Sequence, residues 1–330
     1  MLKTFTTILT SMVSVILLTP ISAQATIFVP TDQPTIQAAI DAAPDFEDIF
    51  VEPGIYYENI NLLNKHLFIT SVSGPEVTII DGGQHDSVVT YLSGRGGVIA
   101  GFTMRNGRSG PDTPGLGRGA GVRIGNASFP TIIQNVITGN RGCEGIGIAS
   151  DNASPTISLN VITENSQFGC SGGLGGAAVS VVGDEGTFKF TQIVENIITN
   201  NSLNSANGGG ISLFSAGDAE VRANLIKGNA AAGPMVCPQG GGIWIIDSAG
   251  AKILDNIIIG NTAGCGGGVY WSVPSGSSVG PRLVNNTIVD NNAAIGAGVF
   301  ATGANSGASV FNNIIIQTDA QTALECDTAT

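Results

Sequence analysis

The sequence predicts an all-β fold in which short parallel strands wind into a solenoid. Two phrases that recur through most of the chain support this prediction. The first reads Asn, any residue, an apolar residue, two further residues and Asn, and its copies start at Gly101 (degraded), Asn135, Asn160, Asn196, Asn224, Asn256, Asn286 and Asn313 (degraded). The second is a glycine cluster followed by alternating apolar residues, from Gly119 to Gly296. The first phrase returns every 25 to 36 residues, a period typical of repeats that bury their apolar sides by stacking.

Three segments of each repeat show strand periodicity. In the glycine-led segment 240–245, Ile243 and Ile245 fall on one side and Trp244 on the other. The segment before each Asn phrase and the Asn phrase itself are also strand-like. Three strands per repeat with no helix between them predict a three-sided parallel coil, in which each turn supplies the crossover that parallel strands need. We expect Ile243, Ile257 and Trp271 to face the core.

The asparagines that open each phrase are interpreted as structural. We expect each to sit at a tight bend in the left-handed conformation, which Asn tolerates better than other non-glycine residues. Stacked about 4.8 Å apart in successive coils, each side-chain amide could donate to one neighbour and accept from the next.

The first 25 residues are typical of a cleaved signal peptide. Lys3 gives a positive start, Ile8–Leu18 is an apolar run too short to span a bilayer, and Ala23–Ala25 resembles a cleavage site. An uncleaved anchor is the alternative. We expect a secreted, periplasmic or cell-surface protein, without a transmembrane segment after cleavage and monomeric. The net charge is −12, and loss of Lys3 with the signal peptide would make it 12 − 25 = −13. Such a charge argues against nucleic-acid binding, which needs a basic surface.

Residues 26–62 are predicted to form an N-terminal cap. Apolar residues at helical spacing predict a helix over Pro34–Ala43, which Pro44 ends. Such a helix would cover the exposed end of a solenoid. Strands are expected at Asp48–Val51, Leu67–Ser71 and Val77–Ile80, the repeats at 63–318, and a C-terminal tail at 319–330. No segment of that tail resembles a cap, which suggests a truncated chain.

Four cysteines occupy the same place in their repeats, between a closing Asn and the next glycine cluster. Cys143 and Cys170 lie in consecutive repeats, as do Cys237 and Cys265. Export permits disulfides, and stacking places each pair on neighbouring loops. We therefore predict the bridges Cys143–Cys170 and Cys237–Cys265, with Cys326 free.

Three N-terminal segments, Val29–Ile40, Val51–Ile60 and Thr78–Gly82, resemble the opening of pectin-lyase-like right-handed parallel β-helix proteins. The resemblance continues through the repeats to Thr318. It implies a right-handed coil whose relatives mostly handle acidic carbohydrate polymers. This superfamily includes lyases, hydrolases, esterases, epimerases, tailspikes and adhesins, so the fold does not define an activity. The catalytic motifs of pectin methylesterases, polygalacturonases and pectate lyases are missing from the sequence.

One candidate binding surface is a row of aromatic side chains. Aligning the glycine-led strands gives an outward column of Arg123, Ala149, Ser180, Ser212, Trp244, Tyr270 and Phe300. Trp244, Tyr270 and Phe300 would form an exposed strip on which sugar rings could stack. The alternative is a ladder that is inert or covered by a loop.

A second candidate is a cluster of arginines. Six of the eight arginines lie between residues 95 and 141: Arg95, Arg105, Arg108, Arg118, Arg123 and Arg141. Arginine pairs bidentately with carboxylates, so a uronate polymer could dock here, with Arg118 and Arg141 as binding residues. Alternatively, the arginines neutralise the neighbouring carboxylates Asp81, Asp86, Asp112 and Glu144.

A lyase would need a cation beside the uronate carboxylate and a base for the adjacent proton. Arg105, Arg108 or Arg123 could supply the cation, and His85 is the candidate base, whereas His66 is interpreted as structural. No metal site is identified; calcium could replace the arginines, but no spacing matches a defined calcium loop.

Together these features predict an exported β-helix that binds and possibly modifies an extracellular, acidic polysaccharide, with lyase-like chemistry if it is catalytic. The alternatives are a non-catalytic surface or adhesion protein and a protein-binding repeat domain.

Overall fold

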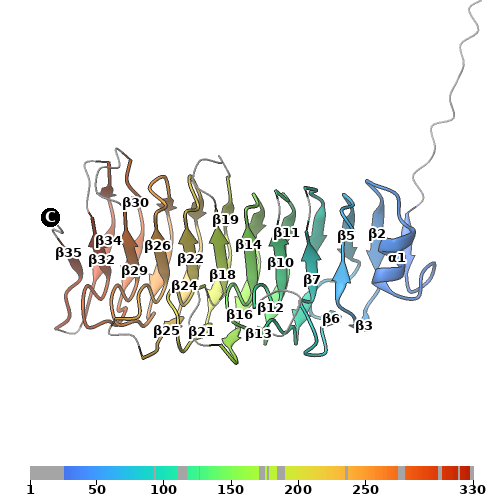
Figure 1. Ribbon diagram of the computed structural model, residues 1–330, viewed down its shortest axis with the longest axis horizontal. Helices are drawn as coiled ribbons and strands as arrows, with labels where there is room; N and C mark the ends of the chain where they lie inside the picture. The colour runs from blue at the N-terminus through green and yellow to red at the C-terminus, as the bar shows by residue number, and fades with distance from the viewer. Residues whose placement is uncertain are drawn as a thin grey trace, which may run out of the picture.

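The protein is a long stack of β-coils (Figure 1). The computed structural model describes residues 26–92, 94–110, 117–125, 127–170, 175–176, 178–183, 190–234, 237–273, 279–303, 307–318 and 320–327. The predicted signal peptide lies outside these residues. No helix in this part of the chain is long and apolar enough to cross a membrane.

Three long parallel sheets run the length of the stack, as predicted. Sheet A contains β1 (Ile27–Val29), β2 (Asp48–Val51), β5 (Phe68–Ser71), β8 (Val98–Ala100), β11 (Thr131–Ile133), β15 (Thr156–Ser158), β19 (Gln192–Val194), β23 (Glu220–Arg222), β27 (Lys252–Leu254), β30 (Arg282–Val284) and β33 (Ser309–Phe311). Sheet B contains β3 (Gly54–Tyr57), β6 (Thr78–Asp81), β9 (Thr103–Arg105), β12 (Val136–Thr138), β16 (Val161–Thr163), β20 (Ile197–Thr199), β24 (Leu225–Lys227), β28 (Ile257–Ile259), β31 (Thr287–Val289) and β34 (Ile314–Ile316).

Sheet C is formed by the glycine-led strands. It contains β4 (Ile60–Asn61), β7 (Val89–Tyr91), β10 (Val122–Gly125), β14 (Ile148–Asp151), β18 (Val179–Val182), β22 (Ile211–Phe214), β26 (Ile243–Ile246), β29 (Val269–Ser272), β32 (Val299–Thr302) and β35 (Leu324–Asp327). A short sheet D lies between sheets B and C along the chain and contains β13 (Arg141–Gly142), β17 (Ser166–Gln167), β21 (Ser202–Leu203) and β25 (Ala230–Ala231).

The helix α1 (Ile36–Ala42) sits at the N-terminal end of the stack, beside β1, β2 and β4 (Figure 1). It starts later than predicted because Thr35 is its N-cap, whose hydroxyl accepts a hydrogen bond from the Ala38 amide. The Glu58 carboxylate accepts hydrogen bonds from the backbone amides of Ile36 and Gln37. The first-turn amides, which have no partner within the helix, are thus bonded to the neighbouring coil. Ile36 and Ile40 are buried against the first coil.

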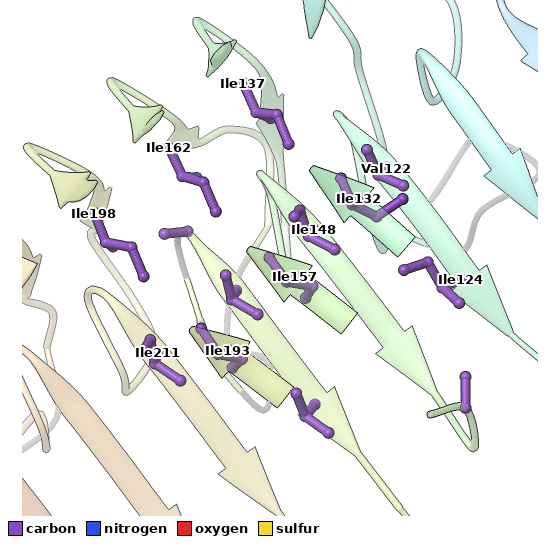
Figure 2. Packing of buried hydrophobic residues seen from close by; sticks show 14 of the residues in the cluster. Val122, Ile124, Ile132, Ile137, Ile148, Ile157, Ile162, Ile193, Ile198 and Ile211 are labelled. Carbon is purple, nitrogen blue, oxygen red and sulfur yellow. The ribbon is translucent and has the colours of Figure 1, made fainter. Parts of the chain in front are cut away.

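The core is a set of stacked aliphatic columns between the three sheets. Each three-residue strand of sheets A and B generally buries only its central side chain. Figure 2 shows two such columns converging with the sheet C residues: Ile132, Ile157 and Ile193 of sheet A, and Ile137, Ile162 and Ile198 of sheet B. Identical neighbours along the axis allow each side chain to pack in the same rotamer as the next.

The asparagines form two continuous ladders, one at each end of the sheet B strands. The first contains Asn135, Asn160, Asn196, Asn224, Asn256, Asn286 and Asn313, and the second Asn140, Asn165, Asn201, Asn229, Asn261 and Asn291. In the first, Asn160 donates its Nδ2 to Oδ1 of Asn196 at 3.0 Å, which confirms the predicted stacking. The predicted backbone is wrong: the left-handed residue is the one before the ladder Asn, for example Gln134 with φ 56° and Leu159 with φ 56°.

The degraded first copy is shifted by one residue from its predicted alignment. Because Thr103 pairs with Val136, Phe102 occupies the place of Asn135, and Gly107 that of Asn140. Their backbone amides still donate to the Oδ1 atoms of Asn135 and Asn140. The ladders therefore begin on a coil that supplies only donors.

Both predicted disulfides are confirmed. Cys143–Cys170 and Cys237–Cys265 join consecutive coils, each with a Cα–Cα distance of 5.5 Å, and Cys326 is free and exposed. Ile243 and Trp271 face the core as expected, but the prediction for Ile257 is wrong. Ile257 is 49% exposed and Ile258 is fully buried, because the strand starts directly after Asn256 and points its second residue inward.

The burial of Ile258 and the exposure of Ile257 can be tested by substituting each of these neighbouring residues. We predict that Ile258→Asp prevents folding, because a buried unpaired carboxylate costs several kcal/mol. Ile257→Asp should change the free energy of unfolding by only about 0.5 kcal/mol, as is usual for surface positions. Thermal unfolding followed by circular dichroism compares the two. Equal stability of both variants would contradict the register of sheet B.

Candidate functional site

The outward column of sheet C has the predicted register. Backbone pairing aligns Arg123, Ala149, Ser180, Ser212, Trp244, Tyr270 and Phe300 on successive strands. The predicted exposed aromatic strip is nevertheless wrong, because Trp244 and Tyr270 are each only 6% exposed. The loop that precedes each strand covers this column.

Left-handed glycines bring these loops onto the column. Gly240 has φ +67°, and a Cβ at this position would lie 2.8 Å from Cβ of Trp244. Gly266 has φ +63°, and a Cβ at this position would lie 2.7 Å from Cβ of Tyr270. A side chain would collide at both places, so glycine is required for the chain to fold back over its own strand.

The covered aromatics form a small core of their own. Trp244 donates its indole N–H to Oε1 of Gln239 at 2.9 Å, and its ring stacks on Phe214 at 6.3 Å between centroids. Cys237, Cys265 and Tyr270 pack into the same cluster. These rings therefore hold the loop and its disulfide against sheet C, and Phe214 and Phe300 remain partly exposed.

Because Trp244 is packed, its truncation should affect folding. We predict that Trp244→Ala lowers the free energy of unfolding by about 3 kcal/mol, the usual cost of truncating a buried aromatic. Phe190→Ala, an exposed ring, is the matched control and should be nearly neutral. Denaturant titration gives both values. A neutral Trp244→Ala would show that the loop does not cover the ring.

Several of the clustered arginines are paired with carboxylates. Arg118 lies 3.3 Å from Glu144 and also contacts Asp151, Arg105 lies 2.9 Å from Asp81, and Arg95 lies 3.5 Å from Asp45. Arg123 adds positive charge near Asp151. The alternative of internal neutralisation thus applies to Asp81 and Glu144, whereas Asp112 lies outside the described residues.

The ion pair of Asp81 and Arg105 is embedded in the wall of the coil. Burial opposes ionisation of Asp81, but hydrogen bonds from the Gly83 amide, Arg105 and Asn106 outweigh it and lower the pKa of the carboxyl. His85 is exposed and does not contribute to this set of partners. The structure therefore does not join His85 and Asp81 into a catalytic pair.

The lowered pKa gives Asp81 a pH-dependent contribution to stability. The ionised form stabilises the fold above the ordinary pKa of 3.8, and this contribution is lost as pH falls through the still lower pKa of the folded state. We predict that Asp81→Asn costs about 1.5–3 kcal/mol at neutral pH, the typical worth of hydrogen bonds to a charged group. The difference from wild type should shrink in strong acid. Unfolding titrations at both pH values measure it, and a pH-independent difference would contradict this account.

Asp151 is the described carboxyl best suited to proton transfer. Burial raises its pKa, while the charges of Arg118 and Arg123 and the hydrogen bond from Arg118 oppose that rise. A carboxyl that keeps its proton more readily can act as a general acid. Among the described residues, no three His, Cys, Asp or Glu side chains gather in a cluster that could hold a metal ion.

The structure reveals an exposed aromatic row that the sequence did not predict. It lies on the corner between sheets C and A and comprises Phe46, His66, Phe129 and Phe190, which we call the aromatic corner. Phe46 and Phe129 are each 53% exposed and Phe190 is 45% exposed. His66 packs between Phe46, at 4.8 Å, and Phe129, at 6.4 Å between centroids.

A fixed offset places these rings in line. Each lies three residues before the buried central residue of its sheet A strand, which is Ile49, Ile69, Ile132 or Ile193. The same position holds Gly96 in the coil between His66 and Phe129, and a Cβ there would lie 2.7 Å from the Phe129 ring. The offset is visible in the sequence, and counting back from the sheet A isoleucines could have found the row.

Cations accompany the aromatic corner. Lys252 places its Nζ 5.6 Å from the centroid of Phe190, and Arg95 is the residue before Gly96, with its side chain 49% exposed beside Asp45. Both positive groups lie beside the row in a protein of net negative charge. They give it a partly cationic border.

Arg108 and Arg141 lie elsewhere, at the edge formed by sheet D. Their guanidinium carbons lie 5.5 and 6.0 Å from the centroid of Phe168. A separate depression of about 380 Å³ at the corner of sheets A and B is lined by residues such as Gln134, Leu159 and Val161, with no charged side chain among its lining residues. It offers no group for acid–base chemistry.

Comparison with known proteins agrees with this architecture. A family model described as right handed beta helix region matches residues 175–327, and one described as protein of unknown function (DUF1565) matches residues 65–203. Comparison with curated proteins finds no match. Among solved structures, the chain resembles the A-module of the mannuronan C-5 epimerase AlgE4 of Azotobacter vinelandii, with 15% identity, a TM-score of 0.45, and coverage of 88% of this chain and 92% of that one.

The described chain therefore has the fold of a parallel β-helix, and its residues 175–327 are similar to the right-handed β-helix region family. A structural likeness at this identity and TM-score carries no inference about activity. The function has to be argued from the surface of this molecule.

Proposed function

We propose that the protein binds an extended, acidic polysaccharide along the aromatic corner. The observation that carries this proposal is the exposure of Phe46, Phe129 and Phe190 in one line on the same corner of the coil. Exposed aromatic rings provide flat apolar area for the C–H faces of sugars while polar groups beside them bind hydroxyls.

The dimensions favour a chain over a single sugar. Phe46 and Phe190 belong to coils five strand spacings apart, so the row spans about 24 Å along the axis. Phe129 and Phe190 are two spacings apart, with Ser154 between them, which leaves a gap of about 10 Å between rings. A ligand that contacts all three rings has to be linear.

The charged neighbours favour an acidic ligand. Lys252 and Arg95 stand beside the row, and each could contact a uronate carboxylate. Export is part of the proposal, and the two disulfides support it because such bonds persist in oxidising compartments. The surface-adhesion alternative shares this binding face and differs only in lacking chemistry.

Catalysis is the second candidate, favoured by the partly buried Asp151 beside Arg118. A lyase would generate an unsaturated product that absorbs ultraviolet light, so incubating the bound polymer with the protein distinguishes a lyase from a binding protein.

Removal of the rings tests the binding proposal. We predict that Phe129→Ala with Phe190→Ala weakens binding to pectate or alginate by about 2 kcal/mol or more, the size of an interface hot spot. Stability should hardly change, because both rings are exposed. Retardation in polymer-containing gels and calorimetry with long oligouronates measure the effect.

The matched control is Phe311→Ala, which removes an exposed phenylalanine of sheet A that lies off the aromatic corner. It should bind as wild type does. If the wild-type protein binds no acidic polymer in a broad panel, the aromatic corner is not a polysaccharide site. The same conclusion follows if the Phe129→Ala, Phe190→Ala variant binds as wild type does.

A further inference from the structure

Two arginines on adjacent coils share one exposed aromatic ring at the sheet D edge. Arg108 pairs with Arg141 through a parallel backbone bridge. Both guanidinium groups approach the ring of Phe168, at 5.5 and 6.0 Å, and about half of this phenylalanine is exposed. Arg141 is exposed and forms no ion pair with any described carboxylate.

This arrangement has an electrostatic cost. Like charges on directly paired strand positions destabilise a sheet, and the two arginines here are such a pair. Stacking on Phe168 offsets part of the cost, since cations are attracted to the face of an aromatic ring. An anion bound beside the exposed Arg141 guanidinium would offset a further part of the cost.

The site is held in place before any ligand arrives. Arg141 lies two residues before Cys143, and Phe168 lies two residues before Cys170, so the disulfide fixes both loops. Backbone bonds from the Phe168 amide to the Gly142 carbonyl and from the Arg141 amide to the Gly107 carbonyl extend the pairing across three coils. A preorganised site loses less conformational entropy on binding.

We propose that Arg108, Arg141 and Phe168 form a binding site for the carboxylate of a uronate residue. The guanidinium groups bind the carboxylate, for which arginine offers a planar bidentate fork, and the exposed part of Phe168 contacts the sugar ring. The choice of a sugar ligand rests on the proposed function. The site lies on a different edge of sheet C from the aromatic corner, so it selects acidic residues independently of that row.

The test compares tetragalacturonate with its methyl ester by calorimetry, using wild type and single variants. Arg141→Ala should weaken binding of the acid about tenfold or more, as expected for loss of charged hydrogen bonds, and leave the weak binding of the ester unchanged. Arg141→Lys should recover only part of the affinity, because lysine lacks the fork. Phe168→Ala should weaken both ligands. Arg282→Ala, an exposed arginine of sheet A, is the control and should behave as wild type.

The outcomes separate this site from the proposed function. If polymers bind through the aromatic corner while Arg141→Ala leaves tetragalacturonate affinity unchanged, the site is disproved and the function stands. If no polymer is retarded but tetragalacturonate binding depends on Arg141, the function fails and the site stands. If inorganic sulfate competes as strongly as the uronate and Phe168→Ala has no effect, the site is a general anion site and the uronate assignment is overturned.

Discussion

The hydrogen-bonded ladders of buried asparagine side chains are the interaction on which the rest of the structure depends. Oδ1 of Asn196 accepts both the backbone amide and the side-chain amide of Asn160, and Nδ2 of Asn160 also donates to the carbonyls of Ile132 and Ser158. Every polar atom of the amide is used, and only an Asn at the same height in the next coil can use it. An unsatisfied buried amide is costly, so each coil fixes the register of its neighbour. This constraint explains why the asparagines recur while the spacing between them varies from 25 to 36 residues.

A fixed register at sheet B decides where the molecule can vary. The links between sheets A and B are mostly short, such as Gln134–Asn135, although residues 72–77 form a longer link between β5 and β6. Longer segments leave the coil between sheets B and C and between sheets C and A. The buried aromatic cluster, the arginine pairs, the aromatic corner and the Arg108–Arg141 site all lie on these two edges. Both proposed binding surfaces therefore lie on the borders of sheet C.

The sequence was sufficient for features that follow from periodicity, and insufficient for those that depend on loops. Repeats placed in line predict which residues stack, and therefore the disulfides and the outward column of sheet C. Whether a stacked side chain meets water depends on the path of the preceding loop, which the φ of Gly240 controls, and so the exposure of Trp244 was predicted wrongly. The prediction that Ile257 faces the core was wrong for a related reason. A run of three isoleucines has no alternation of apolar and polar residues that would indicate which side chain points inward. The aromatic corner was missed because its rings lie outside strands and share no motif, only an offset.

The charge distribution limits the kinds of polymer that the surface can bind. A chain with a net charge of −12 repels a dense polyanion at long range, and pairing with Asp81, Glu144 and Asp151 screens Arg105 and Arg118 from ligands. Cations near the proposed binding surfaces include Lys252 and Arg95 beside the rings, although Arg95 also pairs with Asp45, and Arg141 on the opposite border. Salt should screen the overall repulsion and the local attraction together, so binding should depend on salt far less than for a basic polyanion-binding protein. Stacking on rings, supplemented by single carboxylate contacts, is the mode of recognition that such a surface can support.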